Sequence, residues 1–158
     1  MKELLHLDQH PEFPNKFYGI IINTPGTNCI NIIDYDEETN CILNYKVSFP
    51  FYFGFIPQTY LDDYPVFFVF FSDKKFDLYT KLELEPILFF KVPKENVINI
   101  VYSKLYNYEL EIKKENIDNI FKEFFELENV VKVAKADSFL ENANNNYHKK
   151  FIKLHKKS

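Results

Sequence analysis

The 158-residue sequence is long enough for one domain with a buried core, and its 46% hydrophobic and 27% charged residues exclude a disordered chain. The net charge of −4 gives no overall attraction to nucleic acid or to an anionic membrane, and no arginine is available to grip a phosphate with two parallel hydrogen bonds. Residues 1–13 lack an apolar signal segment and no apolar run reaches membrane-spanning length, so we expect a soluble intracellular protein.

The first two thirds of the chain favour strands. Residues 1–16 show no regular period and are expected to form an N-terminal arm. Segments rich in Ile, Tyr, Val and Phe, which are typical of strands, follow at 17–23, 28–35, 41–49, 65–71, 78–92 and 97–105. The polar cluster DEETN at 36–40 predicts a turn that joins the second and third segments into a hairpin. PVFFVFF (65–71) has no polar side chain on either face, which predicts a fully buried strand.

The last third of the chain favours helices. KKENIDNIFKEFFELE (113–128) has a stripe at three-and-four spacing, which predicts an amphipathic helix with Ile117, Ile120, Phe121, Phe124 and Phe125 on its apolar face. Residues 129–136 predict a short strand. Asp137 or Ser138 is expected to cap a second helix. Its predicted apolar face consists of Leu140, Ala143, Tyr147, Phe151 and Leu154.

Strands followed by helices predict an α+β domain, a small curled sheet or barrel that carries helices at one end. We expect a single domain over 1–158, in which 17–136 form the barrel and first helix and 137–158 form a basic C-terminal helix.

Seven short motifs occur in an order that resembles the soluble inorganic pyrophosphatases. They are INTP, DYDEET, FGFIPQT, DDYPV, KVP, a helix ending FFELE, and VVKVAK, and the similarity runs from about Phe17 to Ala136. The resemblance implies a five-stranded OB-like barrel and a homo-oligomer. It also implies hydrolysis of pyrophosphate by several Mg²⁺ ions that clustered acids hold, with Lys, Arg and Tyr side chains on the phosphates.

The family's metal-binding signature, Asp-x-Asp-Pro-x-Asp, is only partly present. The matching stretch runs from Asp62 to Phe67, and its first acid is Asp62, whereas Tyr64 and Phe67 stand where the second and third acids are expected. Mg²⁺ requires several converging oxygen ligands, and neither replacement supplies a carboxylate. We therefore expect no metal cofactor.

Most of the other functional positions that the resemblance implies also carry a less polar residue than the family's. Asp34 keeps an acid and Lys46 keeps the charge of an arginine. The remaining positions carry residues in place of two acids, three lysines and three tyrosines, namely Asn23, Ile32, Phe49, Phe53, Pro86, Leu88, Phe124 and Phe125. The residues that match the family's scaffold are Pro25, Gly54, Ile56, Thr59, Pro65, Pro93 and Leu127. The sequence thus predicts a pyrophosphatase fold without the reaction, which serves binding, assembly or a structural role with a protein partner or a second copy.

An active, Mg²⁺-dependent diphosphatase is the alternative interpretation. It would use the residual pocket positions Asp34, Lys46, Asp62 and Asp63, with Asp62 as a metal ligand and pyrophosphate as substrate. Against it, Asp62 and Asp63 are adjacent, and in an extended chain their side chains would point to opposite faces. We favour a solvated turn before the buried strand as the interpretation of both aspartates.

Histidine and cysteine residues suggest no separate site. His6, His10, His148 and His155 lack acid or Cys partners at zinc spacing and are expected at the surface. Cys29 and Cys41 fall in predicted strands, where buried thiols are usually inert, and they do not resemble a secreted disulfide framework.

Two further features leave alternatives open. Five lysines from Lys149 onward could bind nucleic acid or an acidic partner, although lysines at a helix C-terminus also suit the helix dipole. The aromatic runs, such as 67–71 and 124–125, form either core or an exposed apolar patch that marks an interface.

Overall fold

The computed structural model describes residues 2–93, 95–107, 114–128, 131–133 and 136–152, and it contains a closed five-stranded barrel. The barrel strands are β1 (Phe17–Asn23), β4 (Tyr52–Phe55), β5 (Phe67–Phe70), β7 (Val97–Leu105) and β6 (Lys81–Pro93), paired in that order. A pairing between β1 and β6 closes the barrel, and β8 (Val131–Val133) extends the sheet from β6. The parallel pair is β5 with β7, and the other pairs are antiparallel. The predicted α+β fold with a five-stranded OB-like barrel is confirmed.

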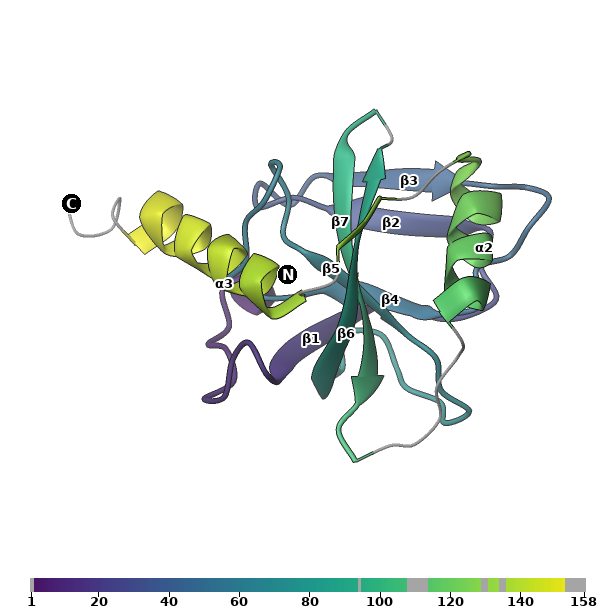
Figure 1. Ribbon diagram of the computed structural model, residues 1–158. Helices are drawn as coiled ribbons and strands as arrows, with labels where there is room; N and C mark the ends of the chain where they lie inside the picture. Colours follow the sequence, from purple (N-terminus) through teal and green to yellow (C-terminus); the bar gives the residue numbers. More distant parts are fainter. Residues whose placement is uncertain (1, 94, 108–113, 129–130, 134–135, 153–158) are drawn as a thin grey trace.

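A two-stranded hairpin and helices complete the fold (Figure 1). The hairpin consists of β2 (Cys29–Ile33) and β3 (Thr39–Leu43). The helices are α1 (Lys2–Leu5), α2 (Lys114–Phe125), α3 (Ala136–Tyr147) and the π-helical turn η1 (His148–Ile152). Figure 1 shows α2 beside the hairpin and α3 on the opposite side of the barrel. Among the described residues, none of the helices combines the length and the apolar character needed to cross a membrane.

The predicted hairpin is present, but its second strand lies earlier than the predicted segment 41–49. The strand begins at Thr39 and ends at Leu43 because the buried Asn44 stops it. The Asn44 side-chain oxygen accepts hydrogen bonds from the backbone N–H groups of Lys46 and Val47 at 2.9 and 3.2 Å. Its amide nitrogen donates to the carbonyl oxygens of residues 123 and 124 in α2 at 3.2 and 3.0 Å.

The predicted helices are also present, but α3 begins at Ala136, so Asp137 and Ser138 lie in its first turn and do not cap it as predicted. The stripe of α2 faces the core, with Ile117, Phe121, Phe124 and Phe125 buried. In α3 the predicted face is buried at Leu140, Ala143 and Tyr147, Phe151 beyond it is half-buried, and Leu154 lies outside the described residues.

Phenylalanine rings fill the centre of the molecule. All of β5 is buried, as predicted, and Phe89, Phe90, Phe124 and Phe125 are at most 1% exposed. The aromatic runs are therefore core and do not form an exposed patch.

A close approach between β1 and β4 requires glycine at position 54. A Cβ atom there would lie 1.9 Å from the carbonyl oxygen of Ile20, which no side chain can tolerate. The packing of these two barrel strands thus requires glycine at this position.

Candidate functional site

A cluster of five phenylalanines occupies the positions at which the resemblance places polar catalytic groups. Phe49, Phe53, Phe67, Phe124 and Phe125 come from the loop after β3, from β4, from β5 and from α2, and each is at most 1% exposed. The Phe49 ring centroid lies 5.0 Å from that of Phe124, 6.1 Å from that of Phe125 and 6.4 Å from that of Phe53. The Phe53 and Phe67 rings stack at 5.1 Å. These positions are brought together, but they form packed hydrocarbon.

The energetics favour a dry cluster at this point. Full burial of each ring contributes about 1.5–3 kcal/mol, and favourable ring pairs add roughly 0.5–1.5 kcal/mol. An ion in the same space would lose its water without gaining oxygen ligands from the rings, which costs far more than any one ring contact returns. The cluster therefore stabilises the fold.

Asp62 forms an ion pair with the side chain of Lys91. Its Oδ2 accepts a hydrogen bond from Asn99 Nδ2 at 2.9 Å and one from Lys91 Nζ at 3.3 Å. Lys91 Nζ also donates to Asn99 Oδ1 at 3.0 Å, so the three side chains form a closed triangle. The positive charge that faces this carboxylate is thus supplied by the chain itself.

The chain between Leu61 and Tyr64 is a tight turn and is not extended. The N–H of Leu61 donates to the carbonyl of Tyr64 at 2.9 Å, and the N–H of Tyr64 donates back at 3.3 Å. The two central residues, Asp62 and Asp63, have φ of 53° and 73°, as in type I′ turns, where Asp and Gly are preferred. Their side chains have different partners, since Asp63 accepts a hydrogen bond from Tyr60 Oη at 3.2 Å. The turn that the sequence predicts before the buried strand is present.

Asp34 and Lys46 are held apart at opposite ends of β3. Asp34 Oδ1 accepts hydrogen bonds from the N–H groups of Asp36 and Glu38 at 2.9 and 3.0 Å, so this carboxylate caps the β2–β3 turn. Lys46 is exposed in the loop after β3. The five residues of β3 span about 17 Å, and the structure therefore does not join these two side chains in one pocket.

Asn23, which stands where the resemblance expects an acid, ties β1 to the hairpin. Its Nδ2 donates to the carbonyl of Cys29 at 3.2 Å, and its Oδ1 accepts from the N–H of Asn31 at 2.9 Å. The side chain is 8% exposed, and both its nitrogen and its oxygen bond to backbone groups.

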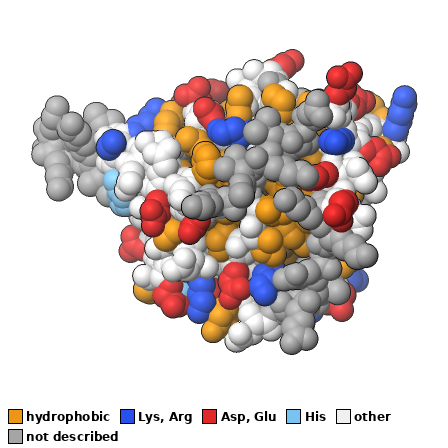
Figure 2. Space-filling view, in the orientation of Figure 1, with side chains coloured by type: hydrophobic (Ala, Val, Ile, Leu, Met, Phe, Trp, Pro, Cys, Tyr) orange, Lys and Arg blue, Asp and Glu red, His pale blue; other side chains and the backbone are white. Residues whose placement is uncertain are grey.

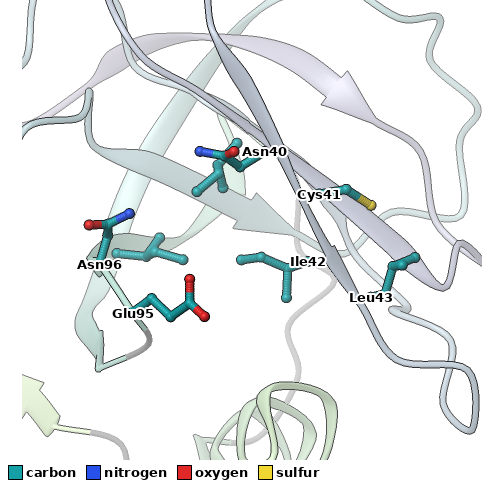
Figure 3. A pocket seen from close by; sticks show the side chains of 8 residues that line it. Asn40, Cys41, Ile42, Leu43, Glu95 and Asn96 are labelled. Atoms are coloured by element: carbon teal, nitrogen blue, oxygen red, sulfur yellow. The ribbon is translucent and has the colours of Figure 1, made fainter.

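A groove of about 570 Å³ lies between β3 and the turn that joins β6 to β7 (Figure 3). Asn40 and Ile42 face it from β3, and Glu95 and Asn96 face it from the turn. The amides of Asn40 and Asn96 donate to Tyr64 Oη at 3.5 and 3.2 Å, so the residue in place of the second signature acid now bridges the two sides. These amides were missed from the sequence, because isolated asparagines in strands and turns carry no signal.

Mg²⁺ does not fit the residues that the structure describes. Among the described residues, no three His, Cys, Asp or Glu side chains lie together as ligands of one ion. The signature acid that remains, Asp62, has the Lys91 ammonium 3.3 Å from its carboxylate, and an ammonium repels a second cation.

The lysine-rich end contacts the barrel at Lys150. Lys150 Nζ donates to Tyr60 Oη at 2.8 Å and lies 4.3 Å from the centre of its ring. This hydrogen bond, assisted by the charges of Tyr60, Asp63 and Asp36, raises the pKa of the Lys150 ammonium. Residues 153–158 of the predicted basic helix lie outside the described residues. Figure 2 shows acidic and basic side chains interspersed on the visible face.

Two predictions about histidines and cysteines were wrong. The side chain of His10 is only 8% exposed and its Nε2 lies 2.6 Å from Glu83, a partner 73 residues away that spacing cannot reveal. His6 packs against the rings of Tyr35, Tyr147 and Phe151. Cys29 and Cys41 form a disulfide across the hairpin, with a Cα–Cα distance of 6.0 Å, and Cys41 is exposed.

No protein-family model matches the chain, and no curated protein matches it by sequence. Solved structures of inorganic pyrophosphatases share its fold. That from Thermus thermophilus aligns with a TM-score of 0.69 at 17% identity and covers 92% of this chain and 98% of its own. The structure from Helicobacter pylori aligns with a TM-score of 0.66 at 17% identity and covers 90% of this chain and 98% of its own. The type I enzyme from P. falciparum gives 0.64 at 11% identity, covering 96% of this chain and 64% of its own. The fold is that of the soluble inorganic pyrophosphatases.

Proposed function

We propose that this chain is a non-catalytic protein with the pyrophosphatase fold, whose role is binding or assembly. The observation that carries the proposal is the cluster of Phe49, Phe53, Phe67, Phe124 and Phe125, which is buried where the fold's catalytic groups are expected. The Lys91 ammonium beside Asp62 supports it, because it neutralises the carboxylate that the alternative interpretation needs.

The test is a steady-state phosphate-release assay with pyrophosphate and Mg²⁺, run beside the Thermus thermophilus enzyme as positive control. We expect no turnover that depends on the chain, since the highly charged transition state of phosphoryl transfer needs oriented cations and waters, for which the packed rings leave no place. Metal-dependent turnover near ordinary enzyme rates, of about 1–10³ s⁻¹, would refute the proposal.

A double variant separates a weak enzyme from a contaminant. If any phosphate release is found, Asp62→Ala/Asp63→Ala should abolish it only when the alternative is correct and these acids take part. Equal release by the parent and the double variant would assign the activity to a contaminating enzyme.

Ligand binding without turnover is measured separately by thermal shift. A ligand that binds the folded state at one hundred times its Kd stabilises by about 2.7 kcal/mol, which a melting curve resolves readily. We expect no concentration-dependent shift with Mg²⁺ and pyrophosphate together. A shift that grows as mass action requires would show that a phosphate site survives.

A further inference from the structure

The outer edge of β3 has no strand paired with it among the described residues. β3 pairs with β2 on one side, and its five residues are exposed except for the half-buried Ile42. An open strand edge presents unsatisfied N–H and C=O groups that another strand can pair with. The edge is therefore a place where a further strand can add.

The hydrogen bonds of the hairpin show which backbone groups are open. Asn44 N–H donates to the carbonyl of Asn28 at 2.9 Å, and Asp34 N–H donates to the carbonyl of Glu38 at 3.1 Å. Hydrogen-bonded pairs alternate along an antiparallel ladder, so the even-numbered residues from 38 to 44 face β2. The N–H and C=O groups of Thr39, Cys41 and Leu43 consequently point outward.

The edge lacks the usual protection against self-association. Natural edge strands carry charged residues, especially lysine, or proline, whereas the segment TNCILNY (39–45) has neither. Six large apolar side chains in the described part of the chain are strongly exposed, and two of them, Leu43 at 50% and Tyr45 at 86%, belong to this segment. A third, Val97 at 37%, follows the groove residue Asn96.

We propose that the partner at this edge is a second copy of the chain, paired antiparallel through β3 about a two-fold axis at Cys41. In this register Cys41 faces Cys41 and Thr39 faces Leu43 of the other copy, so all the outward groups of β3 meet a partner. The same register brings Asp36 toward Lys46 of the other copy, and both are exposed charges of opposite sign. The result is a continuous four-stranded sheet made of two hairpins.

This inference deepens the assembly role proposed above by naming the partner. An inactive protein that is monomeric would overturn it and leave the loss of catalysis standing. An active protein that dimerises through β3 would refute the loss of catalysis and leave the dimer inference standing.

Light scattering after size exclusion, across a concentration series, tests the pairing. The wild-type chain should give twice the 19.0 kDa of one copy. Leu43→Lys and Thr39→Glu should each raise the dimer dissociation constant by about tenfold, because each loses two symmetry-related cross-strand contacts worth up to ~1 kcal/mol. Leu78→Lys is the matched control, since Leu78 is also half-exposed (48%) but lies far along the chain from β3, and it should leave the mass unchanged.

The double variant Thr39→Glu/Leu43→Lys tests the register. It places a carboxylate opposite an ammonium twice in each dimer, and the dissociation constant should return to within about threefold of the wild-type value. Circular dichroism of each variant checks that the hairpin still folds.

Cross-linking provides a measurement that does not depend on affinity. With Cys29→Ser, a short bis-maleimide should join two copies through Cys41, whose Cα atoms would lie about 5.5 Å apart. With Cys41→Ser, the remaining Cys29 residues would be roughly 20 Å apart, because three strand spacings separate them across the sheet and four residues separate them along it, and a short reagent should not join them. A monomer at all concentrations, an oligomer insensitive to both single variants, or no capture through Cys41 would each overturn the inference.

Discussion

Phe53→Tyr restores a hydroxyl that the pyrophosphatase resemblance expects, and in this protein we expect it to destabilise the fold. Phe53 is 1% exposed, and its ring stacks on Phe67 at 5.1 Å within the aromatic cluster. A buried hydroxyl without a partner costs about 1–3 kcal/mol. Taking about 2 kcal/mol, and about 2–4 °C for each kcal/mol in a chain of this size, Tm should fall by roughly 4–8 °C.

The control for this variant is Phe139→Tyr. Phe139 stacks on Phe89 at 4.7 Å but is half-buried on α3, so an added hydroxyl can reach water. Thermal melts by circular dichroism and urea titrations of the two variants give the comparison. If Phe53→Tyr shifts Tm no more than the control does, the cluster is hydrated and open, and the reasoning that it excludes ions fails.

Two further outcomes follow from the packing. Gly54→Ala should prevent normal pairing of β1 with β4, since its Cβ would lie 1.9 Å from the Ile20 carbonyl oxygen. We expect the cooperative unfolding transition in urea to weaken or disappear. A normal transition would contradict this close contact. Burial raises the pKa of the Tyr35 hydroxyl, which also donates to the Thr59 carbonyl at 2.5 Å. The folded state therefore keeps this proton longer than the unfolded state, whose tyrosine ionises near pH 10. Stability should be level below that pH and fall above it, and Tyr35→Phe should reduce the fall, with a remainder from Tyr147, whose pKa burial also raises.

Residue composition and hydrophobic period together located most of the elements, but not β4 or α1. Every residue of β5 is buried, and the apolar stripe of α2 packs against the core along the whole helix. Their hydrophobic patterns are therefore unambiguous. The third strand was misplaced because its end depends on Asn44, which binds carbonyl groups of α2 some 80 residues later. Such a long-range partner leaves no local pattern.

The disulfide shows how a small shift in a turn hides a contact. A turn centred on Glu38, as DEETN suggests, would leave Cys29 and Cys41 well out of register. The observed ladder pairs Cys29 with Leu43 and Asn31 with Cys41, which makes the cysteines diagonal neighbours on one face. The centre of the turn moves by two residues because the Asp34 carboxylate caps it.

The replacements that the resemblance implies could be proposed from the sequence, but the partners of these side chains could not. The positions of Tyr64 and Phe67 in the signature are local facts, whereas the pairing of Asp62 with Lys91 and Asn99 joins three separate elements. Sequence order indicates which acids are missing, and only the fold indicates what neutralises the acid that remains.

The aromatic cluster and the outer edge of β3 are linked through the β2–β3 hairpin. Phe49 N–H donates to the Thr27 carbonyl at 2.7 Å just before β2, and Ile30, Ile32 and Ile33 of β2 lie in the same apolar cluster as the Phe49 ring. The rings therefore fix the hairpin against the barrel and hold the outer edge of β3 in one orientation. Pre-organisation of this kind lowers the entropy lost on association. We therefore expect Phe49→Ala to lower the stability by about 3–5 kcal/mol and also to weaken dimerisation under conditions where the variant is still folded. If affinity is unchanged in the folded variant, the hairpin binds its partner independently of the aromatic cluster.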